Sequence, residues 1–334
     1  MLASLAFTGL LRSYALSRNV LDIPNQRSSH SVPTPRGGGL AIVLAFVAAM
    51  AFFQFGAYPN PEFMTVLGAA FLVAAIGFFD DHDPVPARWR FLTHLLSAGL
   101  VLYYLRGFPP LLLPAPVDWM LKRGFIDLGW LGYPIGLFLL VWFLNLFNFM
   151  DGTDGIAASE AVFVSGSLAG YLYYLHAFSF EVAGCLASAS LGFLLWNCPK
   201  AKIFMGDVGS GFLGLMLGVL ILMATQQAAV LLYCGFILFG IFIVDASYTL
   251  LYRFFSGQKW YDAHCSHAYQ RAAKRFGHST VLLASWAINL IWLLPISLLV
   301  FLHPHYALLG LMLAYSPLLY LVHWFKAGRA EHTL

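Results

Sequence analysis

The sequence predicts an all-α protein that crosses a membrane many times. Of its 334 residues, 60% are hydrophobic and only 10% are charged, whereas a soluble globular chain is usually about 45–50% apolar and about 25% charged. Apolar segments recur along the whole chain, and many approach the roughly 20 residues that a spanning helix needs. Because irregular backbone cannot face lipid, we expect these segments to be helices.

Eleven segments are expected to span the membrane, and they form a single domain over residues 1–334. No internal repeat and no low-complexity linker divides the chain. The first segment runs into Arg18 without a small-residue cleavage motif, which favours a retained helix over a signal peptide. The expected spans lie near residues 1–18, 38–57, 63–79, 91–106, 131–149, 156–175, 179–196, 209–225, 228–251, 280–301 and 306–325.

The distribution of charge predicts how the chain is oriented. Most of the 18 Lys and Arg residues fall in the loops of one face, which the positive-inside rule assigns to the cytoplasm. The amino terminus is then periplasmic and the carboxyl terminus cytoplasmic. The net charge of +3 does not suggest nucleic-acid binding, and the four separated cysteines fit neither a disulfide framework nor a zinc site. The loop aspartates gather on the same basic face, which orientation does not explain.

The first candidate group is Asp80-Asp81-His82-Asp83, at the end of the third span. Adjacent carboxylates raise each other's pKa unless a cation lies among them. Mg²⁺ usually takes one or two carboxylates together with substrate phosphate oxygens. A solvated acidic helix end is an equally good interpretation of this group alone.

The second group runs from Asn145 to Gly155. Asn145, Asn148 and Asp151 are spaced three apart and share one helical face. Polar side chains so close to an apolar span suggest function. An Asp-Gly turn that includes Asp154 explains the glycines but not the two asparagines.

The third group, Phe204 to Gly211, opens the eighth span. Glycines at a helix amino terminus favour anion binding. Asp207 is either a metal ligand beside a phosphate or simply the helix cap, and Phe204 is placed to stack on a base.

The fourth group, Asp262 to Arg271, lies in the longest basic loop. His264 and His267 form an HxxH pattern without the glutamate of a zinc protease. Beside Arg271 they favour phosphate, and a solvated amphipathic loop is the alternative.

The fifth group, Arg27 to Gly39, contains His30 and Arg36. Basic residues at the interface suit a lipid phosphate, and the alternative is a positive-inside anchor. One further acid, Asp245, lies within the ninth span and either reaches the site or pairs internally.

Together the five groups, from about Asp22 to Arg275, resemble the polyprenyl-phosphate N-acetylhexosamine-1-phosphate transferases of glycosyltransferase family 4. This family includes enzymes that begin O-antigen and enterobacterial common antigen synthesis and the translocase of peptidoglycan synthesis. The stretch from His264 to Gln270 looks most like O-antigen-initiating enzymes that use N-acetylated 6-deoxyhexosamines.

The resemblance implies a Mg²⁺-dependent enzyme, with Mn²⁺ as a substitute, in the bacterial inner membrane with its site on the cytoplasmic face. It would transfer an N-acetylhexosamine-1-phosphate (GlcNAc, or a 6-deoxy relative such as QuiNAc or FucNAc) from a UDP-sugar to undecaprenyl phosphate. UMP would be released, and O-antigen, lipopolysaccharide or related envelope glycan synthesis would begin.

The resemblance also implies roles for single residues. Asp80 and Asp81 match the paired aspartates that handle metal or acceptor phosphate and take up a proton, and Arg90 matches a basic position after them. Asp207 matches the magnesium ligand, with Asp151 as a second candidate. Catalytic roles fall on Asp80, Asp81, Asp154, His264 and His267, and substrate contacts on His30, Arg36, Arg90, Asn145, Asn148, Asp151, Phe204 and Arg271. Ser266 stands where the family has its middle histidine.

Physical chemistry favours the same reaction. A phosphate monoester and a diphosphate repel each other, so a cation and basic groups must offset their charge. A lipid acceptor and a soluble donor also require a site at the inner edge of the bilayer. We expect direct attack on the β-phosphorus, and a two-step route through an aspartyl-phosphate stays open.

Two other functions fit parts of the sequence. Asp151 to Ala158 opens like the CDP-alcohol phosphotransferase pattern, but Ser159 follows where that pattern needs arginine. A lipid or solute transporter would also be polytopic, yet transporters place polar sites near the midplane on broken helices. The donor sugar, the oligomeric state and the role of the loop at residues 107–130 do not follow from the sequence.

Overall fold

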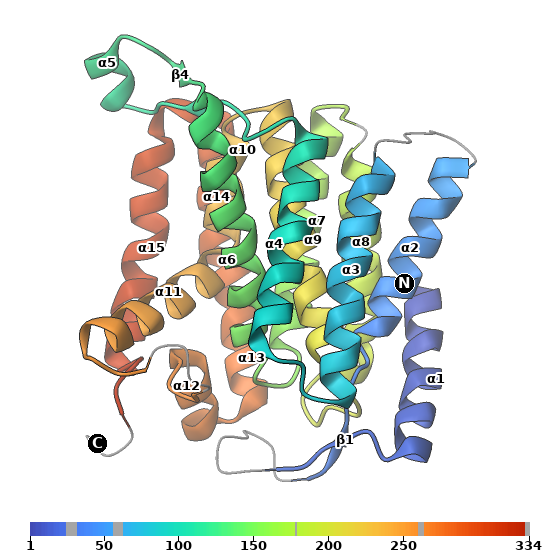
Figure 1. Cartoon of the computed structure of the whole chain (residues 1–334). Helices are drawn as coiled ribbons and strands as arrows, with labels where there is room; N and C mark the ends of the chain where they lie inside the picture. Colours follow the sequence, from blue (N-terminus) through green and yellow to red (C-terminus); the bar gives the residue numbers. More distant parts are fainter. Residues whose placement is uncertain (25–31, 56–62, 178, 260–263, 331–334) are drawn as a thin grey trace.

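The computed structural model describes residues 1–24, 32–55, 63–177, 179–259 and 264–330 and shows a bundle of helices (Figure 1). The predicted all-α class is thus confirmed. Nine of the expected spans each contain one helix. These helices are α1 (Leu2–Arg18), α2 (Leu40–Phe55), α3 (Phe63–His82), α4 (Ala87–Leu105), α6 (Gly132–Met150), α7 (Ile156–Tyr174), α8 (Ser179–Asn197), α9 (Asp207–Gln227) and α15 (Ala307–Trp324).

The ninth expected span is not one straight helix. It is broken into α10 (Leu231–Leu238) and α11 (Gly240–Phe255), which meet at an angle of 72°. At this break the Tyr315 hydroxyl donates to the carbonyl oxygen of Phe236 (2.8 Å). Irregular backbone is tolerated at membrane depth when protein groups satisfy it. The bend turns α11 across the bundle (Figure 1).

The tenth expected span continues through a π-helical segment. It consists of α13 (His278–Ala287), η2 (Ile288–Leu293) and α14 (Leu294–Leu302). Asn289, in the π segment, donates its side-chain amide to Glu160 of α7 (2.8 Å), and both residues are buried. This hydrogen bond ties the π segment between α13 and α14 to α7.

By length and composition, six helices in the described part of the chain can cross a membrane, or seven if the bent pair counts as one span. The six lie at Phe63–His82, Gly129–Met150, Ser179–Asn197, Asp207–Gln227, His278–Leu302 and Pro304–Trp324. The chain is therefore a multi-pass membrane protein. The total of eleven crossings and their orientation stay predictions.

Helix α9 is the centre of the bundle. Every residue from Val208 to Thr225 is buried, and the helix packs against α2, α3, α4, α6, α7, α8 and α10. A helix that is apolar on all sides belongs in such a central position. Its first residue, Asp207, consequently lies in the middle of one end of the molecule.

Short elements lie at the two ends of the bundle (Figure 1). On the end that contains Asp207, β1 (Leu21–Asp22) pairs antiparallel with β2 (Thr34–Pro35), and α12 (Ala268–Phe276) precedes α13. The opposite end has β3 (Leu111–Leu112) paired antiparallel with β4 (Phe125–Ile126), together with α5 (Val117–Leu121) and the short turns η1 (Gly129–Leu131) and η3 (Pro304–Tyr306).

Candidate active site

The start of α9 is capped by an aspartate from another helix. The backbone amides of Asp207 and Val208 donate to the two carboxylate oxygens of Asp81 at 2.8 and 3.1 Å. The N-cap residue is Gly206, so Asp207 does not cap its own helix. A Cβ on Gly206 would lie 2.4 Å from an oxygen of Asp81, and its φ of 76° also favours glycine. The carboxylate of Asp207 is left to make other contacts.

Three side chains from separate elements converge on Asp207. The Arg36 and Arg90 guanidinium groups each reach one carboxylate oxygen at 3.4 Å, and the Asn148 side-chain amide donates at 3.0 Å. The same amide nitrogen lies 2.9 Å from Ser210 Oγ. Segments before α2, in α4 and in α6 therefore meet at the first turn of α9.

The paired aspartates of α3 have different surroundings. Asp80 accepts from Arg90 and from the backbone amide of Val85, both at 2.6 Å, and its carboxylate comes within hydrogen-bonding reach of Asp207. Asp81 is buried and binds Arg36 at 2.7 Å in addition to the two α9 amides. Asp80 thus faces the cluster, whereas Asp81 joins α3 to α9.

A fourth acidic side chain, Asp151, lies near the other three. Burial, together with the charges of Asp207 and Asp81, raises the pKa of Asp151 well above that of an ordinary aspartate. Burial alone would lower the pKa of Arg36, but Asp81 and Asp207 raise it further than burial lowers it. Carboxylates that repel one another in this way are suited to a hard divalent cation.

The donor set fits Mg²⁺ held partly by substrate. Among the described residues, no group of three or more His, Cys, Asp or Glu side chains forms a complete metal cage. Mg²⁺ usually takes one or two carboxylates and fills its remaining positions with water and phosphate oxygens. Asp207, with Asp80 within reach and the carboxyl group of Asp151 nearby, provides that kind of partial site.

Asp154 joins three loops. One carboxylate oxygen accepts from the backbone amides of Lys200 and Ala201 at 2.9 and 3.1 Å, and the other lies 3.2 Å from Nδ1 of His278. Burial raises the pKa of Asp154, but these hydrogen bonds outweigh it, and the pKa is lowered. The contacts of Asp154 are structural, and its predicted catalytic role stays a prediction. His278 was not among the predicted site residues, and its only signal in the sequence is its position directly after the helix-ending Gly277.

A cavity of about 270 Å³ opens beside Asp207 between α3, α4, α6 and α9. Asn145, Asn148 and Arg90 contribute its polar wall, and apolar side chains including Val73 and Phe91 form the rest. Asn145 also donates to the Val141 carbonyl oxygen of its own helix at 2.7 Å. His94 lines the same cavity and was missed, although its position four residues after Arg90 places both on one helical face.

The histidine segment packs against the end of α6. The rings of His264 and His267 are stacked with centroids 4.9 Å apart, and Ser266 Oγ lies 3.1 Å from Nδ1 of His264. Burial, with His267 and Arg253 nearby, lowers the pKa of His264 to about 3, so this ring is neutral. Arg271 donates to the carbonyl oxygen of Arg329.

Two other predicted residues are described less fully. Phe204 is half-buried, and its backbone pairs with Pro35 and Gly38 at 2.8 and 2.9 Å. This pairing joins the loop before α9 to the loop before α2. His30 lies outside the described residues. No contact tests the expected stacking of Phe204 on a base, so it stays a prediction.

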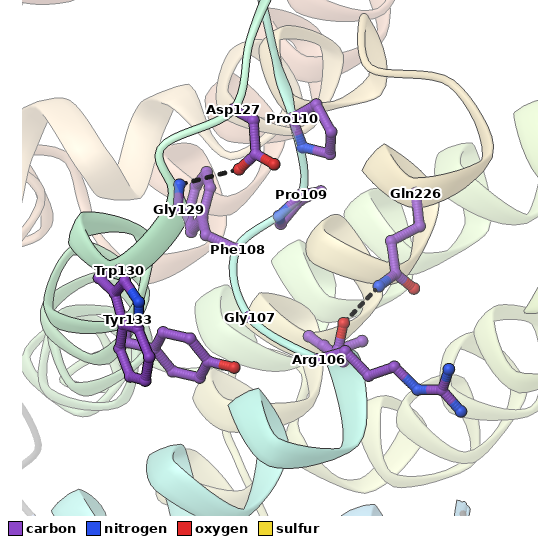
Figure 2. A pocket seen from close by; sticks show the side chains of 11 residues that line it. Arg106, Gly107, Phe108, Pro109, Pro110, Asp127, Gly129, Trp130, Tyr133 and Gln226 are labelled. Atoms are coloured by element: carbon purple, nitrogen blue, oxygen red, sulfur yellow. Dashed lines mark hydrogen bonds between the residues drawn. The ribbon is translucent and has the colours of Figure 1, made fainter.

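A second cavity, of about 470 Å³, lies at the opposite end of the bundle. Figure 2 shows its walls, which come from the segment after α4, the segment before α6 and the last turn of α9. Gln226 donates to the Leu105 carbonyl oxygen (2.9 Å), and Asp127 accepts from the Gly129 amide (2.8 Å). None of the residues predicted for catalysis lines this cavity.

The chain is similar to known membrane transferases. Residues 63–225 match the model of glycosyl transferase family 4. A probable undecaprenyl-phosphate N-acetylglucosaminyl 1-phosphate transferase of Bacillus subtilis is 28% identical over 81% of this chain and 74% of the relative. The phospho-N-acetylmuramoyl-pentapeptide-transferases of Thermodesulfovibrio yellowstonii and Leptospira biflexa are 31% and 30% identical, over 72% and 68% of this chain and 72% and 69% of the relatives.

Proposed function

The chain belongs to the polyprenyl-phosphate hexosamine-1-phosphate transferase family, within glycosyl transferase family 4, and we propose that it moves an N-acetylhexosamine-1-phosphate from a UDP-sugar to undecaprenyl phosphate. Transfer of a phosphosugar to a polyprenyl phosphate is the common chemistry of this family. We also propose a donor sugar, a dependence on Mg²⁺ and a role in the cell.

The observation that carries the proposal is the convergence at Asp207. Carboxylates, two arginines and an amide from five segments meet there at the end of the membrane helices. Such a cluster suits two phosphorylated substrates, because its arginines bind phosphate oxygens and its carboxylates hold a cation. The cavity beside the cluster has apolar walls, which supports binding of a lipid-linked acceptor there.

The chemistry follows from this arrangement. An acceptor phosphate oxygen forms a bond to the β-phosphorus of the donor, and the bond from that phosphorus to the bridging oxygen breaks, so UMP leaves with the electron pair. Arg36 and Arg90 exchange their aspartate contacts for phosphate oxygens and hold the two anions in line. A Mg²⁺ ion held by Asp207 and Asp151 would neutralise charge on the diphosphate.

The two paired aspartates take different roles in this proposal. Asp80 is the group that accepts a proton from the acceptor phosphate, because its carboxylate faces the cluster. Asp81 holds the amides of α9 and the guanidinium of Arg36, so its oxygens are already engaged. His264 and His267 lie on the neighbouring wall and contact the donor diphosphate or sugar.

We propose a bacterial inner-membrane location with the site on the cytoplasmic side. Basic residues at the Asp207 end of the bundle support that orientation, and UDP-sugars are cytoplasmic. A role in starting O-antigen or a related envelope glycan, with GlcNAc or a 6-deoxy relative as donor sugar, rests on the histidine segment from His264 to Gln270.

The test uses purified protein in detergent with undecaprenyl phosphate and a panel of UDP-GlcNAc, UDP-GalNAc and their 6-deoxy relatives. We expect lipid-linked product with at least one donor in Mg²⁺, none with EDTA, and recovery when Mg²⁺ or Mn²⁺ is added back. No product from any donor, with the protein folded, would contradict the proposed function and favour a transporter.

A further inference from the structure

Asp245 is a buried acid in the membrane region whose partners belong to the histidine segment. It lies on α11 after the 72° bend and is 3% exposed. Its Oδ1 accepts from the backbone amide of Ala268 (3.0 Å) and from Thr249 Oγ1 (3.1 Å), and its Oδ2 accepts from the amide of Tyr269 (2.9 Å). The carboxylate therefore holds the first amides of α12, which have no partner within their own helix.

The same carboxylate contacts the side chain of His267. Nδ1 of that ring lies 3.2 Å from Oδ1 of Asp245, and both side chains are almost fully buried. An ionised carboxylate can only accept a hydrogen bond, so we assign the hydrogen of this contact to Nδ1 of His267. The position of a histidine proton is set by the partner of one ring nitrogen, and this in turn determines what the other nitrogen can do.

The His267 ring is also held on its faces. It stacks on His264, with centroids 4.9 Å apart, and lies parallel to Phe149 at 6.3 Å. Phe149 is the neighbour of Asn148, which donates to Asp207. The ring consequently belongs to the wall next to the Asp207 cluster, and its Nε2 edge faces away from Asp245.

The helix that carries His267 is fixed against the cluster as well. Tyr269 donates its hydroxyl to the carbonyl oxygen of Phe149 at 2.9 Å. A Cβ on Gly152 would lie 2.3 Å from that hydroxyl and 2.9 Å from the side-chain amide of Gln270. Gly152 follows Asp151, so α12 touches the backbone beside one of the clustered carboxylates.

We propose that Asp245 is a positioning residue that holds His267 in a single orientation and tautomer, with Nδ1–H toward Asp245 and Nε2 toward the donor diphosphate. This inference rests on the proposed function for the identity of the substrate. The geometry of the pair itself does not depend on that function. At metal sites, carboxylate partners fix the histidine rings in the same way, and their loss typically costs about 10–100-fold in metal affinity or activity.

The first experiment reads the tautomer directly and requires no turnover. We would record the imidazole ¹⁵N resonances of histidine-labelled protein, using His267→Gln to assign His267 among the 11 histidines. The wild type should carry the hydrogen on Nδ1 of His267, and Asp245→Asn should change that pattern. A hydrogen on Nε2 alone in the wild type would overturn the proposal, even if the transferase activity is present.

The second experiment is a double-mutant cycle on the reaction. Asp245→Asn should lower kcat by about 10–100-fold while the KM for undecaprenyl phosphate stays near that of the wild type. Adding Asp245→Asn to His267→Gln should cause little further loss, because both changes remove the same interaction. Additive losses would mean that Asp245 acts on folding rather than through His267.

Thr249→Val is the matched control. It removes a hydroxyl that donates to the same Asp245 oxygen but leaves the contact between Asp245 and His267 in place. Its kcat should stay within about twofold of the wild type, as expected for a small local change. A loss as large as that of Asp245→Asn would show that any disturbance of α11 lowers activity and would contradict a specific role. Melting temperatures of all variants separate unfolding from loss of positioning.

Discussion

The two ends of the bundle have cavities of different character. The larger, about 470 Å³, lies at the end with β3 and β4 and is lined largely by loop residues. The smaller, about 270 Å³, lies beside Asp207 and is lined by four helices. At the Asp207 end, ion pairs join segments more than 100 residues apart in sequence. At the other cavity, the Gly129 amide donates to Asp127, and the uncharged side chain of Gln226 donates to the Leu105 carbonyl oxygen.

The predicted catalytic and metal residues gather beside the smaller cavity, so in this molecule the predicted site does not coincide with the larger volume. A membrane enzyme must bring charged groups to one place against the tendency of each to stay in water, and only an interlocked cluster can keep them there. If function follows the cluster rather than the larger cavity, substitutions at Asp207 have large effects on activity and substitutions at the larger cavity have small ones.

Asp207→Asn should have the largest effect. Loss of a ligand that offsets charge on a transferring phosphoryl group removes several kcal/mol of transition-state stabilisation, which corresponds to about 10³-fold in kcat. The variant should still fold, because Asp81 rather than Asp207 caps α9. Near-normal turnover of purified, folded Asp207→Asn would remove this residue from the mechanism.

Asp80→Asn should mainly lower kcat, whereas Asp81→Asn should mainly lower the stability of the fold. Asp81→Asn weakens charged hydrogen bonds to two α9 amides and Arg36, so we expect a stability loss of about 1.5–3 kcal/mol and a lower melting temperature. Asp80→Asn weakens bonds to Arg90 and Val85 but also relieves repulsion with Asp207, so its melting temperature should fall less than that of Asp81→Asn. Its kcat should fall by about 10²-fold or more, as for a general base. The opposite pattern would exchange the two roles.

Acid should weaken the contact between Asp154 and its loops. The pKa of Asp154 is lowered in the folded state, so its stabilisation is present above the unfolded pKa of about 3.9. It is lost as the pH falls below about 4 through the lower folded pKa. Melting temperatures of wild type and Asp154→Asn should therefore differ at pH 6 and converge toward pH 3. A constant difference would contradict the role of this carboxylate charge.

Changes in the larger cavity should have the smallest effect. Asp127→Asn and Tyr133→Phe alter polar groups on its walls but are far from the Asp207 cluster. Substitutions of this kind are usually worth less than about 0.5 kcal/mol, so kcat and both KM values should stay within about twofold. A large loss of activity would contradict the claim that activity depends on the Asp207 cluster and not on the larger cavity.

Much of the fold follows from apolar length alone. The helix boundaries at α6, α7 and α8 agree with the expected spans within a few residues, because apolar segments end where polar loops begin. The bend between α10 and α11 was not predicted, since its backbone is satisfied by Tyr315, which is 79 residues from its partner Phe236. Local sequence carries no sign of such a distant partner.

The sequence predicts which residues form the site but not which contacts each aspartate makes. Asp80, Asp81, Asn148 and Asp207 do meet, as their positions at the ends of apolar segments indicate. The capping role of Asp81 depends on amides 126 and 127 residues away, and Asp245 finds its partners in another helix. Only the folded structure distinguishes Asp81 and Asp245, which bind helix amides, from the aspartates that face the cluster.

The most direct measurement is the fate of the donor's β-phosphate. With UDP-sugar labelled at that phosphorus and undecaprenyl phosphate as acceptor, label should move into the lipid together with the sugar, and UMP should accumulate in equal amount. Asp207→Asn should prevent both, and Asp127→Asn should prevent neither. Release of labelled UDP, or lipid product without label, would contradict transfer of a sugar phosphate at the Asp207 cluster.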